Sequence, residues 1–353
     1  MSEHTNTRHD DGRRAFVRRS LLRGAALGAA APLLPAAAHA AQDAVPAGAA
    51  PGTSDAPRPD TAARPAQAGP HAATLRWLGT SGWRIGVGGR TVLFDPYITR
   101  FPTGLFGPRG SFDPNTRLSC DEELVARHAG SPELVLVSHT HWDHVGDVPY
   151  IAASTGARVL GTETTYHVLR ALGVDAGQIS VVKGGEVLDF DGFTVEVVAS
   201  RHSRNAKWSY FAPGTLHAAP RRAPRTISDL PEGDTLAFHV TVADGPSYFL
   251  MGASDFDERS AAGLRPDVLM AATPATRSTH RYLPRLLAAL GSPGTVVPVH
   301  WDNFEEPLSA PPRRDPAMDL DAFTAEIRRL SPASRIVVPD YATLYGADLR
   351  PTA

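Results

Sequence analysis

The chain has 353 residues, a formal net charge of -2 and one cysteine, Cys120. One cysteine excludes a disulfide framework and leaves no cluster of thiolates for a metal, so we expect Cys120 to pack or to lie in a loop. The near-neutral charge gives no support to nucleic-acid binding, which needs a basic surface.

The first forty residues have the pattern of a twin-arginine export signal. Arg13-Arg14 and Arg18-Arg19 precede an apolar, alanine-rich stretch at 21–35, and Ala38-His39-Ala40 fits the small-x-small cleavage pattern. Because the apolar stretch is short and interrupted, a cleaved signal is favoured over a membrane anchor. We therefore expect the twin-arginine export machinery to deliver the protein to the periplasm, the cell envelope or the medium. The mature chain would begin near Ala41, with no stable membrane span after cleavage.

A linker is expected at 41–71, because 19 of the 30 residues from 41 to 70 are Ala, Pro or Gly. Such a composition without an apolar period is typical of a disordered tether. Residues 72–353 remain, and this length is enough for one large α/β domain with a substantial core.

The domain begins with segments that read as strands. Apolar residues at 75–78, 83–87 and 91–94 predict three strands, the last two joined by a turn at Gly88-Gly89. Asp95 directly follows the third strand. It would either hold the second nitrogen of a metal-ligating imidazole or form a turn before a proline. Asp147 and Asp302 have the same two interpretations, with the structural one preferred.

The most informative segment is the run SHTHWDHVGD at 138–147. His139, His141, Asp143 and His144 lie within six residues, directly after an apolar strand at 134–137. Imidazole and carboxylate are the ligand types that hold Zn, Mn or Fe. His139 and His141 can point one way while Asp143 and His144 point another, so one loop could serve two adjacent ions.

Three later strand-like runs also lead into a candidate ligand. The run at 194–199 precedes His202, the run at 247–251 precedes Asp255, and the run at 295–299 precedes His300. Ligand sites of α/β proteins gather at the carboxyl edge of the strands. The shared placement favours a common metal site over separate structural roles.

Three helices are expected between and after these strands. Thr162 would cap a helix that runs to Leu172 and ends at Gly173, and His167 on this helix is interpreted as structural. Further helices are predicted at 282–290, closed by a glycine, and at 319–330.

Two loops have the composition of inserts beside a pocket. They are either an apolar wall and a cationic clamp for an acyl or phosphorylated substrate, or ordinary loops with buried aromatics and solvated arginines. His280 is a further candidate for a substrate contact or a residue at a helix entry. The residues concerned are Phe101, Leu105, Phe106 and Phe112 in the loop at 99–115, and Arg221, Arg222 and Arg225 in the loop at 212–234.

With these motifs, the chain resembles the metallo-β-lactamase-fold superfamily of metal-dependent hydrolases. The signature His-x-His-x-Asp-His is matched in full at 139–144, and the likeness extends from about Leu75 to Leu349. The segments LGTSGW at 78–83 and FDP at 94–96 resemble the branch that contains ascorbate-6-phosphate lactonase and the N-acylphosphatidylethanolamine phospholipases D. The resemblance implies an α/β fold, a four-layer αββα sandwich.

The resemblance also implies two metal sites. It assigns His139, His141 and His202 to one metal ion, assigns Asp143, His144 and His300 to a second, and makes Asp255 the bridge between the two ions. One feature departs from the family, which usually places the bridging aspartate directly after the glycine that ends the strand. Here the order is Gly252-Ala253-Ser254-Asp255, and Asp257 is a second candidate.

The expected activity is metal-dependent hydrolysis of an ester or lactone bond in a small molecule. A metal-activated water would attack the substrate, with Asp143 or Asp255 orienting this nucleophile, and with one or two divalent ions, zinc first, then manganese or iron. No Gly-x-Ser-x-Gly elbow supports serine catalysis. The competing hypotheses are a phosphodiesterase of the phospholipase D-like type, an iron-dependent redox enzyme, and a non-catalytic metal-binding envelope protein.

Overall fold

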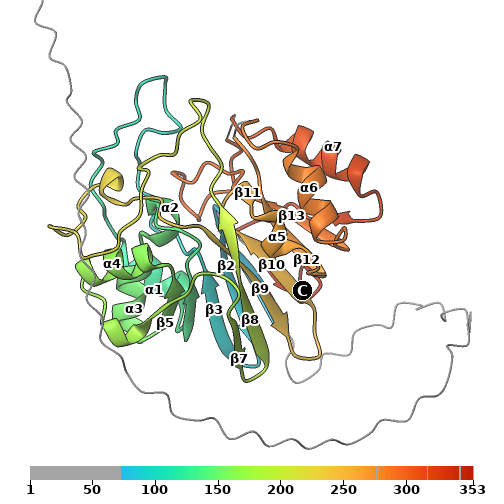
Figure 1. The fold of residues 1–353 in the computed structure, drawn as a ribbon, viewed down its shortest axis with the longest axis horizontal. Helices are drawn as coiled ribbons and strands as arrows, with labels where there is room; N and C mark the ends of the chain where they lie inside the picture. The colour runs from blue at the N-terminus through green and yellow to red at the C-terminus, as the bar shows by residue number, and fades with distance from the viewer. Residues whose placement is uncertain (1–72, 276, 316, 342, 353) are drawn as a thin grey trace, which may run out of the picture. The chain divides into compact units, whose positions relative to one another are not determined.

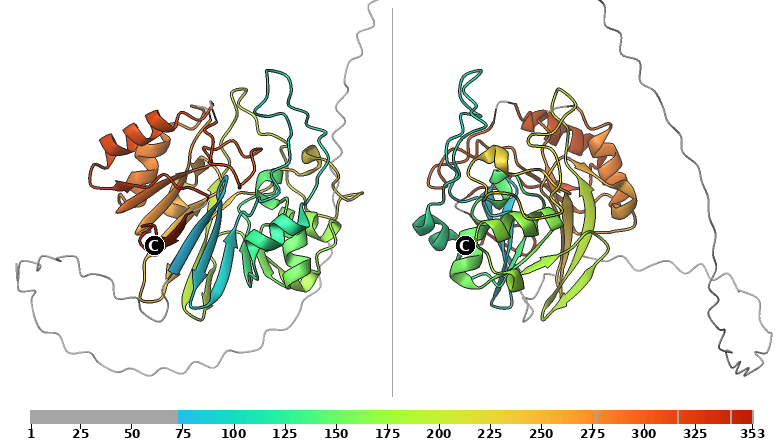
Figure 2. Two further views of the ribbon diagram at one scale, coloured as in Figure 1. Left: turned by 180° about the vertical axis from the view of Figure 1, so that it is seen from behind. Right: turned by 60° about the vertical axis from the view of Figure 1, so that its left-hand side comes forward.

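Two β-sheets face each other in the part of the chain that the structure describes, and helices cover their outer faces (Figures 1 and 2). This computed structural model describes residues 73–352 except 276, 316 and 342. The predicted signal at 1–40 and the predicted linker at 41–71 lie outside the described residues. The four layers confirm the expected αββα sandwich.

The first sheet has an antiparallel half and a parallel half. Its order is β15-β1-β2-β3-β4-β5-β6, and pairing changes from antiparallel to parallel between β3 and β4. Gly88 and Gly89 form the turn between β2 and β3 with positive φ angles of 56° and 84°. The strands are β1 (Ala73–Gly79), β2 (Gly82–Val87), β3 (Arg90–Phe94), β4 (Leu134–Leu136), β5 (Arg158–Gly161), β6 (Ile179–Val181) and β15 (Leu344–Gly346).

The second sheet has the order β11-β8-β9-β10-β12-β13-β14, and β7 pairs with β8. Because β8 and β10 are both antiparallel to β9, while β12 and β13 run parallel to β10, the carboxyl ends of β8, β10, β12 and β13 share one edge. The strands are β7 (Val187–Phe190), β8 (Phe193–Arg201), β9 (Leu236–Val242), β10 (Ser247–Met251), β11 (Asp255–Phe256), β12 (Val268–Ala272), β13 (Thr295–Val299) and β14 (Arg335–Ile336).

The helices begin where the sequence offers caps. Thr162 caps α4 by accepting from the Thr165 amide while the Thr165 hydroxyl reaches back to the Thr162 amide, and Asp319 caps α7 by accepting from Ala322. None of the described helices is both long and apolar enough to cross a bilayer. The helices are α1 (Glu122–Ala129), α2 (Trp142–Val145), α3 (Val148–Thr155), α4 (Glu163–Ala171), α5 (Glu258–Ala261), α6 (Tyr282–Ala289) and α7 (Leu320–Leu330), with 3₁₀ turns η1 (Ala176–Gln178) and η2 (Ile227–Asp229).

The core lies between the sheets, and it brings their carboxyl edges together. Phe94 of β3 meets Phe238 of β9 edge to face, with ring centroids 6.0 Å apart. After β10, Gly252 passes so close to the first sheet that a Cβ there would overlap Ser138 Oγ and lie 2.6 Å from Asp95 Oδ2. The segments that follow β3, β4 and β10 therefore meet at one place.

Candidate metal centre

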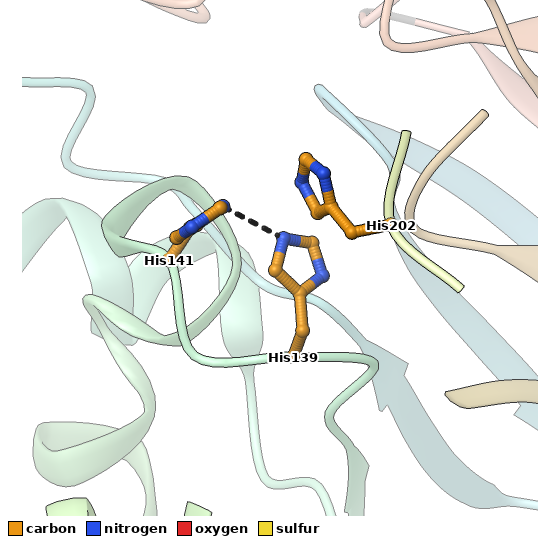
Figure 3. A group of neighbouring side chains, drawn as sticks. All are labelled: His139, His141 and His202. Carbon is orange, nitrogen blue, oxygen red and sulfur yellow. Dashed lines mark hydrogen bonds between the residues drawn. The ribbon is translucent and has the colours of Figure 1, made fainter. Parts of the chain in front are cut away.

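Three histidines from two sheets form the first group of side chains at this edge. His139 and His141 follow β4 and lead into α2, and His202 follows β8. Their candidate ligand nitrogens all lie within 4.8 Å of one another. His139 Nε2 and His141 Nδ1 face each other at 3.2 Å (Figure 3). The structure thus brings together the three histidines that the sequence assigned to one metal ion, and we call them the imidazole triplet.

Oxygen acceptors hold the outer ring nitrogen of each of these histidines. Ser138 Oγ donates to Asp95 and accepts from His139 Nδ1 at 2.9 Å. The Phe211 carbonyl accepts from His141 Nε2 at 2.9 Å, and the Ser203 carbonyl accepts from His202 Nδ1 at 2.7 Å. Such contacts fix the tautomer and the ring plane of a metal-ligating histidine. The other nitrogen of each ring is left to a metal ion.

The imidazole triplet is uncharged at neutral pH. Burial, with a contribution from the neighbouring imidazoles, lowers the pKa of His139 well below its usual value. Burial likewise lowers the pKa of His141 to about 4 and that of His202 to about 3. Because a metal binds the neutral imidazole, this triplet offers three free lone pairs without first losing a proton.

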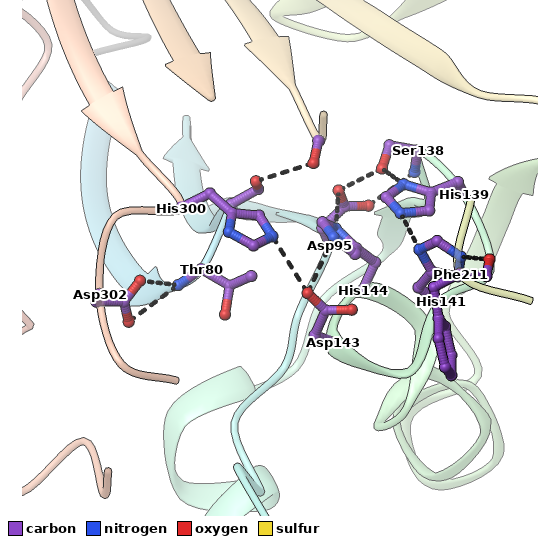
Figure 4. Close-up of polar contacts among 12 residues, drawn as sticks. Thr80, Asp95, Ser138, His139, His141, Asp143, His144, Phe211, His300 and Asp302 are labelled. Carbon is purple, nitrogen blue, oxygen red and sulfur yellow. Dashed lines mark hydrogen bonds and ion pairs between the residues drawn. The ribbon is translucent and has the colours of Figure 1, made fainter. Parts of the chain in front are cut away.

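A second group, which we call the mixed triplet, contains one carboxylate. Asp143 and His144 lie on α2 and His300 follows β13, again with candidate ligand atoms within 4.8 Å of one another. Asp143 Oδ2 lies 3.2 Å from His300 Nε2 and 3.4 Å from His144 Nε2. Asp95 Oδ2 lies 2.8 Å from His144 Nδ1, so Asp95 orients a candidate ligand (Figure 4). Of the two roles expected for Asp95, the structure shows the first, a hydrogen bond to the outer nitrogen of a candidate ligand imidazole.

The mixed triplet carries charge in its metal-free state. Although burial alone would disfavour a charged imidazole, Asp143 and Asp95 raise the pKa of His144 to about 10. Burial would also raise the pKa of the Asp143 carboxyl, yet His144 and His300 hold it well below the usual range. At neutral pH, His144 is therefore an imidazolium beside two carboxylates, and it must lose its proton before it can bind a metal.

The two triplets adjoin each other. The rings of His139 and His144 are 4.0 Å apart between centroids, and those of His144 and His300 are 5.5 Å apart. Three imidazoles in one group, and two imidazoles with a carboxylate in the other, are donor sets that suit Zn and also accept Mn or Fe. The residues present fit a centre for two divalent ions.

Asp255 lies outside both triplets. It begins β11, where it pairs with Arg201 of β8, and its Oδ1 accepts from the Phe256 amide at 2.8 Å. Asp257 caps α5 through the Ser260 amide and pairs with Arg201 at 2.9 Å. Neither carboxylate belongs to either triplet, so the structure gives no support to the bridging role expected for Asp255. Ala253, the residue directly after Gly252, is buried and offers no ligand atom.

Asp147 and Asp302, for which the sequence favoured a structural role, are both buried. Both bind residues at the start of the loop at 99–115. Asp147 accepts from the Ile98 amide at 2.5 Å and from the Thr99 amide at 2.8 Å. Asp302 forms a buried ion pair of 2.6 Å with Arg100, a residue that the sequence did not single out. The preferred structural interpretation of both aspartates agrees with these contacts.

Two phenylalanines of the predicted apolar loop pack on two phenylalanines outside it that contact the triplets, and we call these four rings the aromatic wall. Phe112 packs on Phe211, whose ring lies 5.6 Å from the His141 ring, and Phe106 packs on Phe304, whose ring lies 5.4 Å from the His300 ring. Phe101 instead is buried in the core, edge to face with Tyr97 at 5.8 Å. Leu105 is exposed.

The cationic candidates, three arginines and His280, are exposed. Arg221, Arg222 and Arg225 are exposed, and Arg222 pairs with Asp229 at 3.7 Å. His280 is exposed and lines a cavity of about 590 Å³ with Arg277 and Arg281, and no member of either triplet lines that cavity. Cys120 is an exposed free thiol before α1, and His167 lies 3.8 Å from Glu163 on the same helix. The clamp and the substrate contact of His280 stay predictions.

Comparisons with known proteins identify the family. The model of the beta-lactamase superfamily domain matches residues 74–300, and the chain therefore belongs to that superfamily. It is 27% identical to a protein named UPF0173 metal-dependent hydrolase from Pyrobaculum arsenaticum, over 75% of this chain and 96% of the relative. It is 31% identical to another protein of that name from Polynucleobacter asymbioticus, over 42% of this chain and 49% of the relative. This second alignment thus spans about half the length of the relative.

A solved structure confirms the fold. Igni18, a metallo hydrolase from the archaeon Ignicoccus hospitalis, superimposes with a TM-score of 0.51 over 78% of this chain and 98% of that chain, at 19% identity. The family model and this superposition agree on the metallo-β-lactamase fold, and both of these relatives are named metal-dependent hydrolases. The likeness to the lactonase and phospholipase D branch stays a prediction.

Proposed function

We propose that this protein hydrolyses an ester or lactone bond with the help of two divalent metal ions, with zinc preferred to manganese or iron. The observation that carries the proposal is the pair of adjoining triplets, each with two buried members and one half-buried member, at the carboxyl edge of the sheets. When bound there, divalent ions supply a Lewis acid and an activated water at neutral pH.

Two aspartates of the protein, Asp143 and Asp95, orient the metal ligands and the nucleophilic water. Asp143 is ionised and lies between two imidazoles, so it can hold an ion and orient a nucleophilic water. Asp95 accepts from His144 and from Ser138, and Ser138 in turn holds His139. One carboxylate thereby orients a histidine in each triplet.

The aromatic wall supports a substrate with an apolar substituent. The rings of Phe211, Phe112 and Phe106 are partly exposed. Phe211 lies against the His141 ring and carries Phe112, and Phe106 packs on Phe304 beside His300. Burial of an acyl or aryl group against such rings is favourable by about 25 cal/mol per Å² of apolar surface removed from water. A neutral ester or lactone also has no need of the exposed arginines, and this favours it over a phosphodiester.

The test is a hydrolysis screen on metal-loaded protein with short-acyl esters, long-acyl esters, lactones and phosphodiesters. Phe211→Ala should raise KM for long-acyl esters about 5- to 10-fold and leave short-acyl esters within twofold, because about 50 Å² of lost apolar contact is worth roughly 1.2 kcal/mol. Phe190→Ala, on the distant β7–β8 hairpin, is the matched control and should change neither. Faster turnover of phosphodiesters than of every ester would favour a phosphodiesterase of the phospholipase D-like type.

Metal analysis of the native protein separates a hydrolase from a redox enzyme and from a metal-binding envelope protein. Iron with a visible absorption band and no hydrolysis would favour the redox enzyme. A bound metal with no turnover of any substrate class would favour the metal-binding envelope protein.

We also propose export by the twin-arginine route, on the strength of the two arginine pairs and the cleavage pattern before Ala41. Replacing Arg13, Arg14, Arg18 and Arg19 with lysine should retain folded, metal-loaded protein in the cytoplasm. Continued export of that variant, or an intact amino terminus on exported protein, would contradict the proposal.

A further inference from the structure

His300 differs from the other four histidines in how its ring is held. His139, His141, His144 and His202 each have an oxygen acceptor at the ring nitrogen that faces away from the triplet. His300 Nδ1 is buried and has no hydrogen-bond partner among the described residues. Metal-ligating histidines almost always use that second nitrogen for orientation. The position of His300 must therefore be set by another part of the molecule.

The backbone of His300 is held in its place. Its φ angle is 58°, a left-handed conformation that a residue with a side chain keeps only when its surroundings impose it. The His300 amide donates to the Thr80 carbonyl at 2.7 Å, and Thr80 has a positive φ of 51° itself. The Thr80 amide in turn donates to Asp302 at 3.0 Å (Figure 4). Asp302 thus reaches His300 through one residue.

Asp302 is fixed by a buried cluster. Its carboxylate accepts from the Arg100 guanidinium at 2.6 Å and from the Tyr341 hydroxyl at 2.5 Å, and its side chain is fully buried. Arg100 also donates to the carbonyls of Asn303 and Phe304, at 3.1 Å and 3.3 Å, so it fastens the chain that follows His300.

The close approach of Arg100 is built into the backbone. A Cβ on Gly79 would overlap the Arg100 guanidinium and lie 3.0 Å from Asp302 Oδ2. Trp77 covers the cluster by stacking on Trp301 at 5.2 Å, and it also contacts Tyr341 at 4.9 Å. A buried ion pair loses hydration, and here that loss is offset by several hydrogen bonds to one carboxylate.

We propose that Arg100, Asp302 and Tyr341 are positioning residues for His300, and that they take the place of the missing hydrogen bond at its Nδ1. The inference rests on the proposed binding of a metal by the mixed triplet. It assigns a function to the first residues of the 99–115 loop, whose buried arginine couples this loop to one half of the metal centre. The imidazole triplet does not depend on this cluster.

The experiment measures cobalt binding to metal-free protein by titration, with the visible spectrum and the melting temperature recorded for each variant. Wild-type protein should bind two ions. Asp302→Asn should weaken binding of the ion in the mixed triplet, the second ion, about 10- to 100-fold, which is the loss typical when a metal ligand loses its orienting hydrogen bond. The affinity of the imidazole triplet for the first ion should stay within threefold of wild type. Asp267→Asn is the matched control, because Asp267 accepts from the Ser247 amide at the opposite edge of the same sheet. It should leave both ions unchanged.

Two milder variants keep the inference testable if Asp302→Asn does not fold. Tyr341→Phe removes one hydrogen bond to Asp302, and Arg100→Lys keeps the charge but not the planar fork. Each should weaken the second ion selectively and alter its cobalt spectrum. Equal weakening of both ions, or unchanged binding with a lower melting temperature, would overturn the inference. A wild-type protein that binds one ion would instead overturn the two-metal proposal beneath it.

Discussion

The two triplets use similar residues in different ways. In the imidazole triplet, burial keeps three rings neutral, and three separate oxygen acceptors orient them. In the mixed triplet, one carboxylate and one protonated imidazole neutralise each other until a metal replaces the proton. One site is therefore ready for a metal at neutral pH, while the other must exchange a proton for it.

Removal of a ligand gives the largest effect and tests whether the triplets are separate. His202→Ala should weaken metal binding in the imidazole triplet by at least about 100-fold, and His300→Ala should do the same in the mixed triplet. Loss of a hydrogen bond that orients a ligand already costs about 10- to 100-fold, and loss of the ligand itself should cost at least as much. Metal-to-protein ratios measured by elemental analysis should fall from two to one in each variant. Full occupancy with normal turnover in both would refute the assignment.

A smaller effect is expected from Asp95→Asn, which keeps the shape of the side chain but removes its charge. The variant should weaken the mixed triplet about 10- to 100-fold, because His144 loses the carboxylate that orients it. The imidazole triplet should weaken less, since Asp95 reaches it only through Ser138. Titration of the variant with zinc, compared with wild type, measures both. An equal loss at the two triplets would remove the distinction between them.

The dependence of metal affinity on pH distinguishes the triplets by their protons. The metal-free pKa of His144 is about 10, so a metal entering the mixed triplet below that pH must displace a proton. Affinity there should rise about tenfold for each pH unit between pH 6 and 9. The pKa of His141 is about 4, so affinity of the imidazole triplet should stay flat over the same range. Calorimetric titrations of His300→Ala and His202→Ala measure each triplet alone, and parallel slopes would contradict this distinction.

The smallest effect is expected at Asp255. Its carboxylate accepts from the Phe256 amide and belongs to neither triplet, so Asp255→Asn should change the metal-to-protein ratio as little as Asp257→Asn does. Metal analysis of the two variants side by side makes this comparison. A selective loss of metal in Asp255→Asn would show that metal binding draws this carboxylate into a bridge.

Much of the metal centre could be predicted because its signals are local. One short run contains His139, His141, Asp143 and His144. The ends of the strands before His202 and His300 can be predicted because an apolar run ends shortly before each histidine. The antiparallel and parallel pairing of the second sheet then brings the ends of β8 and β13 to one edge, and packing of the two sheets brings that edge to the end of β4.

Other parts of the site leave no local signal. The acceptor for His141 is the backbone carbonyl of Phe211, and any residue offers such a carbonyl. Arg100, Thr80 and Tyr341 meet Asp302 only through the tertiary fold, from positions 202, 222 and 39 residues away. At Asp255 the carboxylate comes two residues beyond the usual place after the glycine, and the residue pairs with Arg201 of β8 while its carboxylate joins neither triplet.

Anomalous diffraction at the zinc edge, from crystals of the zinc-loaded protein, tests the two-metal centre without any substrate. We expect two peaks in each chain, one among His139, His141 and His202 and the other among Asp143, His144 and His300. A single peak, or a second peak away from the mixed triplet, would contradict a centre built from these two triplets.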